Sequence, residues 1–128
     1  MRYLLLIYTA EPTEAMSDET MGSEQAAYGA FTAWTREKGI LEAGEALAPT
    51  ATATTVRVRD GRTITTDGPF AETKEQLGGF YLVDCRDIDE AIDAAARIPG
   101  ATHGSVEVRP IWEVPSMSTQ TEAAAVTG

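Results

Sequence analysis

Two side chains of this sequence are best suited to acid–base chemistry. Asp67 begins the run Asp67-Gly68-Pro69-Phe70. A carboxylate held at a Gly-Pro turn and partly enclosed by Phe70 is placed to accept a proton as a general base. His103 is the only histidine and lies in a glycine-flanked loop, where binding residues often occur. The pair predicts a proton transfer, with His103 as proton carrier or electrophile.

Each of these residues also has a structural interpretation. The carboxylate of Asp67 can accept backbone hydrogen bonds within an Asx-type turn, and His103 can be a solvent-exposed loop residue. We expect Asp67 to precede the start of a strand at 79–83 and His103 to begin a neighbouring strand at the other end of the sheet. The two would then meet only through a long loop or across a dimer.

Several further residues are candidates for binding a substrate. Glu107 and Arg109 lie two residues apart and so share one face of a strand. The Arg109 guanidinium could bind an anion through two hydrogen bonds, or it could form a solvated pair with Glu107. Glu45, on an earlier strand, could point into the same space. Tyr28 could offer its hydroxyl to a cavity or pack in the core with the aromatic residues that follow it. The predicted substrate-binding set is Gly68, Arg109, Glu45 and Tyr28.

Composition and motif content exclude several classes of function. The 128 residues carry a net charge of −10, which disfavours direct binding to nucleic acid or to anionic membranes. One cysteine, Cys85, permits neither an intrachain disulfide nor a cysteine-based zinc cluster, and it is read as a structural thiol. No nucleotide-binding or metal motif is present, so we predict no cofactor and no metal. The apolar run Tyr3–Tyr8 is too short to span a membrane, and we expect a cytoplasmic protein.

The candidate residues must be positioned by a short series of helices and strands. Apolar periodicity, caps and turn signals define the segments. Ser23 is the expected cap of the first helix, Asp87 with Glu90 forms a capping box for the second, and Asp60-Gly61 signals a hairpin. The expected elements are strands at 3–8, 40–47, 54–59, 62–66, 79–83 and 105–112, helices at 24–38 and 88–98, and a helical turn at 72–76.

This order predicts an α+β fold with one domain at residues 1–113 and a flexible tail at 114–128. Without the hairpin it is the ferredoxin-like βαββαβ plan, an antiparallel sheet with two helices on one face. We expect the strands at 3–8 and 79–83 to be central, adjacent and parallel. Both are apolar on two faces, yet the helices cover only one. We therefore predict a homodimer, or alternatively a hairpin and tail folded over the second face.

Four stretches of the sequence carry a resemblance to a known family: Asp67–Glu75, Gly78–Val83, Gly44–Pro49 and Val106–Ile111. In these stretches the sequence resembles the DGPF branch of the YCII-related proteins, and the resemblance covers roughly residues 1 to 113. It implies a dimeric α+β barrel of ferredoxin-like halves and little known activity. Some members are encoded beside extracytoplasmic-function sigma factors, and a distant branch contains a dehydrochlorinase.

One departure from the family pattern limits what the resemblance implies. The YciI-type branch has a proposed catalytic dyad, a histidine in the first helix and an aspartate just before a following Gly-x-Leu. Tyr28 and Glu37 occupy the matching positions here, so the dyad is absent. Three hypotheses stay open: a small-molecule-binding dimer that serves as accessory or sensor of a sigma factor, a cofactor-free lyase or isomerase using Asp67 and His103, and a protein-interaction module.

Overall fold

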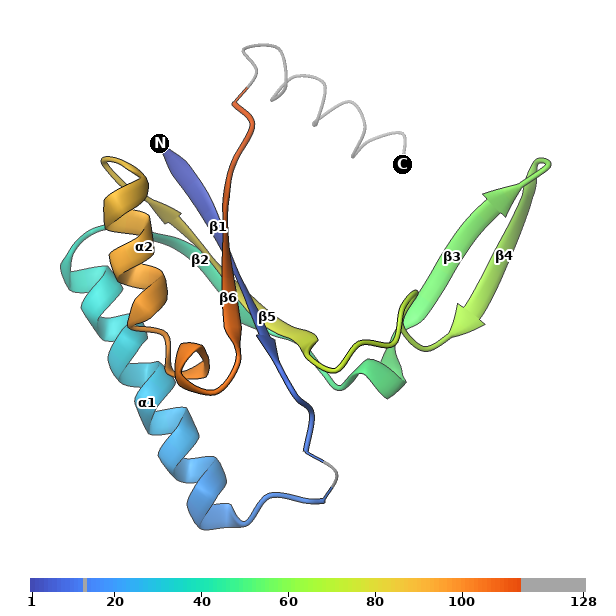
Figure 1. The fold of residues 1–128 in the computed structure, drawn as a ribbon, viewed down its shortest axis with the longest axis horizontal. Coiled ribbons are helices and arrows are strands. Elements are labelled where there is room, and N and C mark those ends of the chain that lie inside the picture. Colours follow the sequence, from blue (N-terminus) through green and yellow to red (C-terminus); the bar gives the residue numbers. More distant parts are fainter. Residues whose placement is uncertain (13, 114–128) are drawn as a thin grey trace.

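The computed structural model describes residues 1–12 and 14–113, which form a four-stranded sheet, a separate two-stranded hairpin and two α-helices (Figure 1). The tail predicted at 114–128 lies outside the described residues. Within the described part, no helix combines the length and hydropathy that a membrane crossing requires. The elements are β1 (Arg2–Thr9), α1 (Asp18–Glu37), β2 (Leu41–Ala46), the 3₁₀ turn η1 (Thr50–Thr52), β3 (Thr54–Arg59), β4 (Arg62–Asp67), β5 (Gln76–Asp84), α2 (Ile88–Ala96), the 3₁₀ turn η2 (Pro99–Thr102) and β6 (Ser105–Pro110).

The main sheet has the strand order β2-β5-β1-β6, and every neighbouring pair is antiparallel. The prediction of an α+β, ferredoxin-like arrangement is confirmed, as is the central position of β1 and β5. The predicted parallel orientation of β1 and β5 is wrong. The crossover through α1 joins β1 to β2, so these two strands are the parallel pair, and β5 is inserted between them in the opposite direction.

The core lies between the sheet and the two helices, which cover the same face (Figure 1). Alternate residues of β1 point into it, because successive side chains of a strand point to opposite faces. Leu5 is fully buried, and α2 packs small side chains closely against the sheet. The buried apolar residues are Tyr3, Leu5, Ile7, Phe31, Ile40, Val83, Cys85, Ala91, Ala94, Ala95 and Ile98.

The other face of the sheet, which we call the open face, is apolar at its centre. Leu4 pairs with Leu82 and Leu6 pairs with Phe80, and all four side chains are half-buried. Figure 1 shows both helices on the opposite face and the β3–β4 hairpin standing clear of the sheet on the open-face side. One alternative expected the hairpin and the tail to fold over this face. The hairpin does not do so.

The sequence predicts one of the two helix caps correctly. Asp87 caps α2 as predicted, its Oδ1 accepting a hydrogen bond from the Glu90 backbone N–H at 2.9 Å. The Glu90 carboxylate in turn accepts a hydrogen bond from the backbone N–H of Arg86 rather than from that of Asp87. Helix α1 begins at Asp18 and is capped by Ser17, so the predicted cap at Ser23 is wrong.

Replacing Ser17 by alanine should lower the free energy of unfolding by about 1 kcal/mol. The Ser17 hydroxyl accepts a hydrogen bond from the Thr20 backbone N–H at 3.1 Å, and alanine leaves that donor without its partner. Ser23→Ala is the matched control, because this exposed residue lies inside the helix, where alanine is favourable. Urea denaturation followed by circular dichroism measures both; an equal loss in the two variants would contradict the assignment.

The segment between the hairpin and β5 is irregular, so the helical turn predicted at 72–76 is wrong. Side chains there bond the backbone groups that a helical turn would use. The Thr73 hydroxyl donates to the Glu75 carbonyl at 2.5 Å, and the Gln76 side-chain amide donates to the Thr73 carbonyl at 2.6 Å. Such local bonds compete with helix formation.

Candidate functional site

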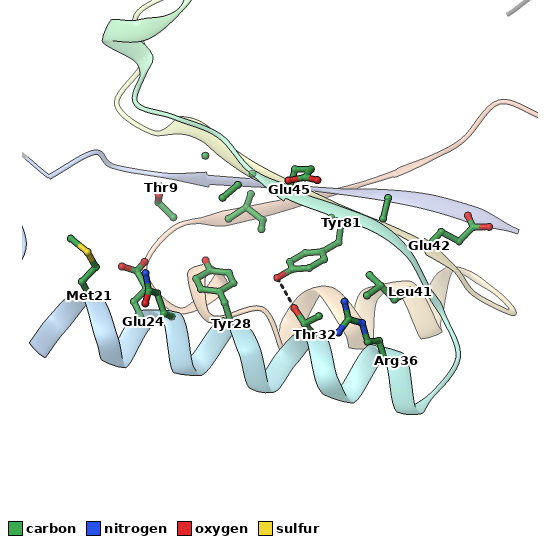
Figure 2. A pocket seen from close by; sticks show the side chains of 17 residues that line it. Thr9, Met21, Glu24, Tyr28, Thr32, Arg36, Leu41, Glu42, Glu45 and Tyr81 are labelled. Carbon is green, nitrogen blue, oxygen red and sulfur yellow. Dashed lines mark hydrogen bonds between the residues drawn. The ribbon is translucent and has the colours of Figure 1, made fainter. Parts of the chain in front are cut away.

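A cavity of about 650 Å³ lies between α1 and the edge of the sheet formed by β2 and β5 (Figure 2). Three of the helix-facing lining residues on these strands, Gly44, Ala46 and Gly79, carry little or no side chain. Gly44 pairs with Tyr81, and Ala46 pairs with Gly79. A Cβ atom at Gly44 would stand 2.6 Å from the Tyr81 ring, and one at Gly79 would stand 2.9 Å from the Glu45 carbonyl oxygen. The Tyr81 ring therefore lies over Gly44, and the Glu45 backbone lies close to Gly79.

The helix side of the cavity is a row of residues that recur every four positions along α1. Glu24, Tyr28, Thr32 and Arg36 lie on the same stripe of the helix and point toward the sheet in Figure 2. The Thr32 hydroxyl lies 3.3 Å from the Tyr81 hydroxyl, within hydrogen-bonding distance. A carboxylate thus stands toward one end of the row, a guanidinium toward the other, and hydroxyl groups lie between them.

Among the hydroxyl groups of this row, that of Tyr28 is best placed to bind a ligand. It is half-buried, and a Cβ atom at Gly100 would stand 2.9 Å from its oxygen, so the Gly100 backbone lies close beside it. Burial raises the pKa of Tyr28, while the Gly100 backbone opposes this in part and the Glu24 carboxylate adds to it. The phenol therefore keeps its proton at neutral pH and can donate a hydrogen bond into the cavity.

Two of the predicted binding residues, Tyr28 and Glu45, lie at this cavity. They contribute differently, since Figure 2 shows the Glu45 side chain on the far side of the sheet from α1. Glu45 pairs with Phe80, and Glu107 pairs with Leu6, so both carboxylates flank the apolar centre of the open face.

Arg109 lies on the open face as well, and its guanidinium contacts Glu107. Its Nε donates to Glu107 Oε2 at 3.1 Å, and Glu107 Oε1 also lies 3.5 Å from the Tyr8 hydroxyl. Arg109 itself is exposed. The expectation that Glu45, Glu107 and Arg109 share one space agrees with this arrangement, but that space is the open face and not the cavity under α1.

Asp67 and His103 lie at the same end of the sheet, contrary to the expectation that they occupy opposite ends. Both β5 and β6 run antiparallel to β1, so the starts of both strands pair with its last residues. Ser105 at the start of β6 donates a hydrogen bond to Glu75 just before β5, at 2.9 Å. The error follows from the wrong strand orientation described above.

The structure places Asp67 and His103 in solvent-exposed positions. Asp67 ends β4, and Phe70 does not enclose it, since 81% of the Phe70 surface is exposed. Residues 1–12 and 14–113 show no hydrogen bond to the Asp67 carboxylate, and the adjacent turn is held by Gly68, whose N–H donates to the Ala53 carbonyl at 2.7 Å. The His103 Nδ1 lies 3.2 Å from the Thr102 hydroxyl. Neither residue lines the cavity, and their catalytic role stays a prediction.

Cys85 and the acidic residues offer no alternative centre. Only 2% of the Cys85 surface is exposed, and burial raises the pKa of its thiol, with the nearby Glu90 and Asp84 carboxylates adding to the rise. The thiol therefore stays protonated and unreactive at neutral pH. Among the residues that the structure describes, no group of three or more histidine, cysteine, aspartate or glutamate side chains is arranged to hold a metal ion.

Sequence reasoning missed the small residues that create the cavity and Thr32 on its helix side. The available signal was glycine within strand patterns, at Gly44 and at Gly78-Gly79. Glycine inside a strand often marks a close approach of another backbone or of a ligand. The side chains around these positions could not be assigned without the register.

Comparison with known proteins agrees with this architecture. The model of the YCII-related domain matches residues 1–115. An uncharacterized protein of Rhizobium meliloti (strain 1021) is 45% identical over 114 residues, which cover 87% of this chain and 92% of that protein. The chain therefore belongs to the YCII-related domain family.

Proposed function

We propose that this protein is a dimeric small-molecule-binding domain whose ligand occupies the cavity under α1. The observation that carries the proposal is the cavity itself, whose volume of about 650 Å³ falls within the range typical of ligand sites. It combines an apolar wall, which includes Ile7 and Leu41, with a few hydroxyl groups that converge from α1 and β5. This combination suits an organic molecule that has one apolar part and one polar part.

The charges around the cavity indicate which polar group it favours. Glu24 lies close enough to Tyr28 to influence the pKa of its hydroxyl, whereas Arg36, the one cation among the lining residues, lies toward the other end of the row. We infer that the ligand carries an amine or hydroxyl that reaches Tyr28 and Glu24. A carboxylate or phosphate at that end would be repelled.

Tyr28→Phe should weaken binding of such a ligand about tenfold, because it removes one hydrogen-bond donor and keeps the shape of the ring. Thermal-shift screening of a mixed library of small amines, alcohols and carboxylic acids supplies the ligands, and calorimetry measures their affinity. Tyr8→Phe is the matched control, since its hydroxyl lies on the open face beside Glu107. A library without amine or alcohol hits, or hits that bind both variants equally, would refute the site.

The dimer is proposed to form through the open face. Leu4, Leu6, Phe80 and Leu82 form its half-buried centre, and the described helices lie on the other side of the sheet. Fully burying each such side chain is worth roughly 1.5–3 kcal/mol. A symmetric pair of sheets would bury eight of them, four from each copy.

An acid–base enzyme that uses Asp67 and His103 is the second candidate. The observation that favours it is their position at one end of the sheet, where Ser105 and Glu75 already join the two loops. The two hypotheses predict that ligand affinity depends on different residues. A ligand whose affinity depends on His103 and not on Tyr28 would favour the enzyme.

A sigma-factor partner and a cytoplasmic location complete the proposal. The partner is an expectation from the family resemblance, and the location is supported by a single, buried, protonated thiol, which suits a reducing compartment. Co-purification of the tagged protein from cells under stress tests the partner. Recovery of the protein without any sigma factor would count against it.

A further inference from the structure

The β3–β4 hairpin is an arm that pairs with no strand of the main sheet. It forms a two-stranded sheet of its own and projects from the body (Figure 1). Its turn, Asp60-Gly61, has φ values of 52° and 76°, as the hairpin motif predicts. Isolated two-stranded hairpins are marginally stable in water at best. The arm therefore gains from packing against a further surface.

The two faces of the arm differ in character. Val56 pairs with Thr65 and Val58 with Thr63, so these pairs form a face of uncharged, β-branched side chains, and 60% of each valine is exposed. Asp67, opposite Thr54, lies on the same face at the root of the arm. The opposite face carries the arginines at 57, 59 and 62 together with Ile64. Packing the valine face against another surface costs less desolvation free energy than packing the arginine face, because its one charged residue, Asp67, lies at the root of the arm.

Hydrogen bonds at the base of the arm fix its direction. The Thr55 hydroxyl donates to the Gly68 carbonyl at 2.9 Å, which joins the two strands at their root. The Glu11 carboxylate accepts hydrogen bonds from the Thr50 backbone N–H at 2.8 Å and from the Thr50 hydroxyl at 2.9 Å, which ties η1 to the segment after β1. The arm therefore leaves the body at a defined angle.

We infer that the arm is a clasp that holds a second copy of this chain, with Val56 and Val58 packed against that copy. The inference rests on the proposed dimer and adds a contact that the open face does not supply. Its direction supports a second copy as the occupant. Figure 1 shows the arm on the side of the sheet away from the helices, so a copy seated on the open face lies beside the arm.

Charge supports the same occupant. Residues 54–67 contain three arginines and two aspartates, a net charge of +1, in a chain whose total is −10. The rest of each copy therefore carries a net charge of −11. This negative charge attracts the arm of the other copy, whereas the remaining parts of the two copies repel each other. The arm is thus the part of the molecule that electrostatics favours for contact with a second copy.

The test compares matched substitutions on the two faces of the arm. Val58→Asp should raise the dissociation constant of the dimer at least about 30-fold, because it places a carboxylate in the contact. Ile64→Asp makes the same change in charge on the arginine face, outside the contact, and should raise the dissociation constant by no more than about threefold. Analytical ultracentrifugation over a dilution series measures both variants, and circular dichroism verifies that each is folded. A Val58→Asp dimer as tight as the unmodified one would overturn the clasp, as would equal weakening by the two substitutions.

Hydrogen exchange provides a second measurement that needs no change in the arm. Backbone amides of residues 54–67 should exchange at least about tenfold more slowly in the unmodified dimer than in a Leu6→Glu variant, whose open face cannot pair. Equal exchange in dimer and monomer would overturn the clasp. A Leu6→Glu variant that stays dimeric would instead refute the proposed open-face dimer, so the two failures are distinguishable.

Discussion

Leu6→Glu is expected to convert the protein to a monomer at micromolar concentration. Leu6 lies on a central strand and pairs with Phe80, in the middle of the apolar open face. A glutamate there places an ionised group where two sheets would meet without water. An unpaired charge buried in this way costs several kcal/mol, and about 4 kcal/mol already raises a dissociation constant about 1000-fold.

The matched control for this variant is Ile92→Glu. Ile92 lies on α2, on the other side of the sheet, and 52% of its surface is exposed. The substitution changes charge and hydropathy equally, yet it should leave the dimer intact. Multi-angle light scattering reports the mass of each variant. An unmodified protein that is monomeric at micromolar concentration, or a dimeric Leu6→Glu, would show that the open face is not the interface.

Ala46→Phe is expected to abolish ligand binding, with a loss of at least about 100-fold. Ala46 pairs with Gly79 on the helix-facing side of the edge strand β2 and lines the cavity. A phenyl ring at this position occupies the space over Gly79 that the ligand needs. The fold should tolerate the ring, because residue 46 is exposed and aromatic residues suit strands.

Ala26→Phe is the control for the cavity variant. Ala26 is an exposed residue of α1 that does not line the cavity, so a ring there should leave affinity unchanged. Calorimetry with the best amine or alcohol from the screen measures both variants. Retained affinity in Ala46→Phe would place the ligand elsewhere and would redirect attention to the end of the sheet that holds Asp67 and His103.

Features set by short stretches of sequence could be predicted, because nearby residues determine them. The hairpin turn depends on Asp60-Gly61, and the cap of α2 depends on Asp87. The end of α1 depends on Gly39, whose φ of 72° follows the last turn. The start of α1 was missed because its first turns are exposed and polar, so they carry no apolar periodicity.

Features that depend on pairing between distant strands could not be predicted as well. The orientation of β5 relative to β1 is set by which strands the α1 crossover joins, and no single residue encodes it. The cavity was missed for a related reason. Small residues of β2 and β5 line it, and the pairing register that brings them together opposite α1 is set by distant parts of the chain. Tyr28 could be named as a candidate from the sequence because its side chain carries a hydrogen-bonding hydroxyl, and it lines the cavity.

The buried state of Cys85 makes the native protein suitable for site-specific spin or fluorophore labelling. It is the sole cysteine of the chain, and its inaccessible, protonated sulfur should be inert toward maleimides and methanethiosulfonates. A new cysteine at the exposed position 59 near the hairpin tip would therefore take up the probe alone. Pulsed electron resonance between two such probes can then measure how far apart the tips lie, with no need to replace the natural sulfur.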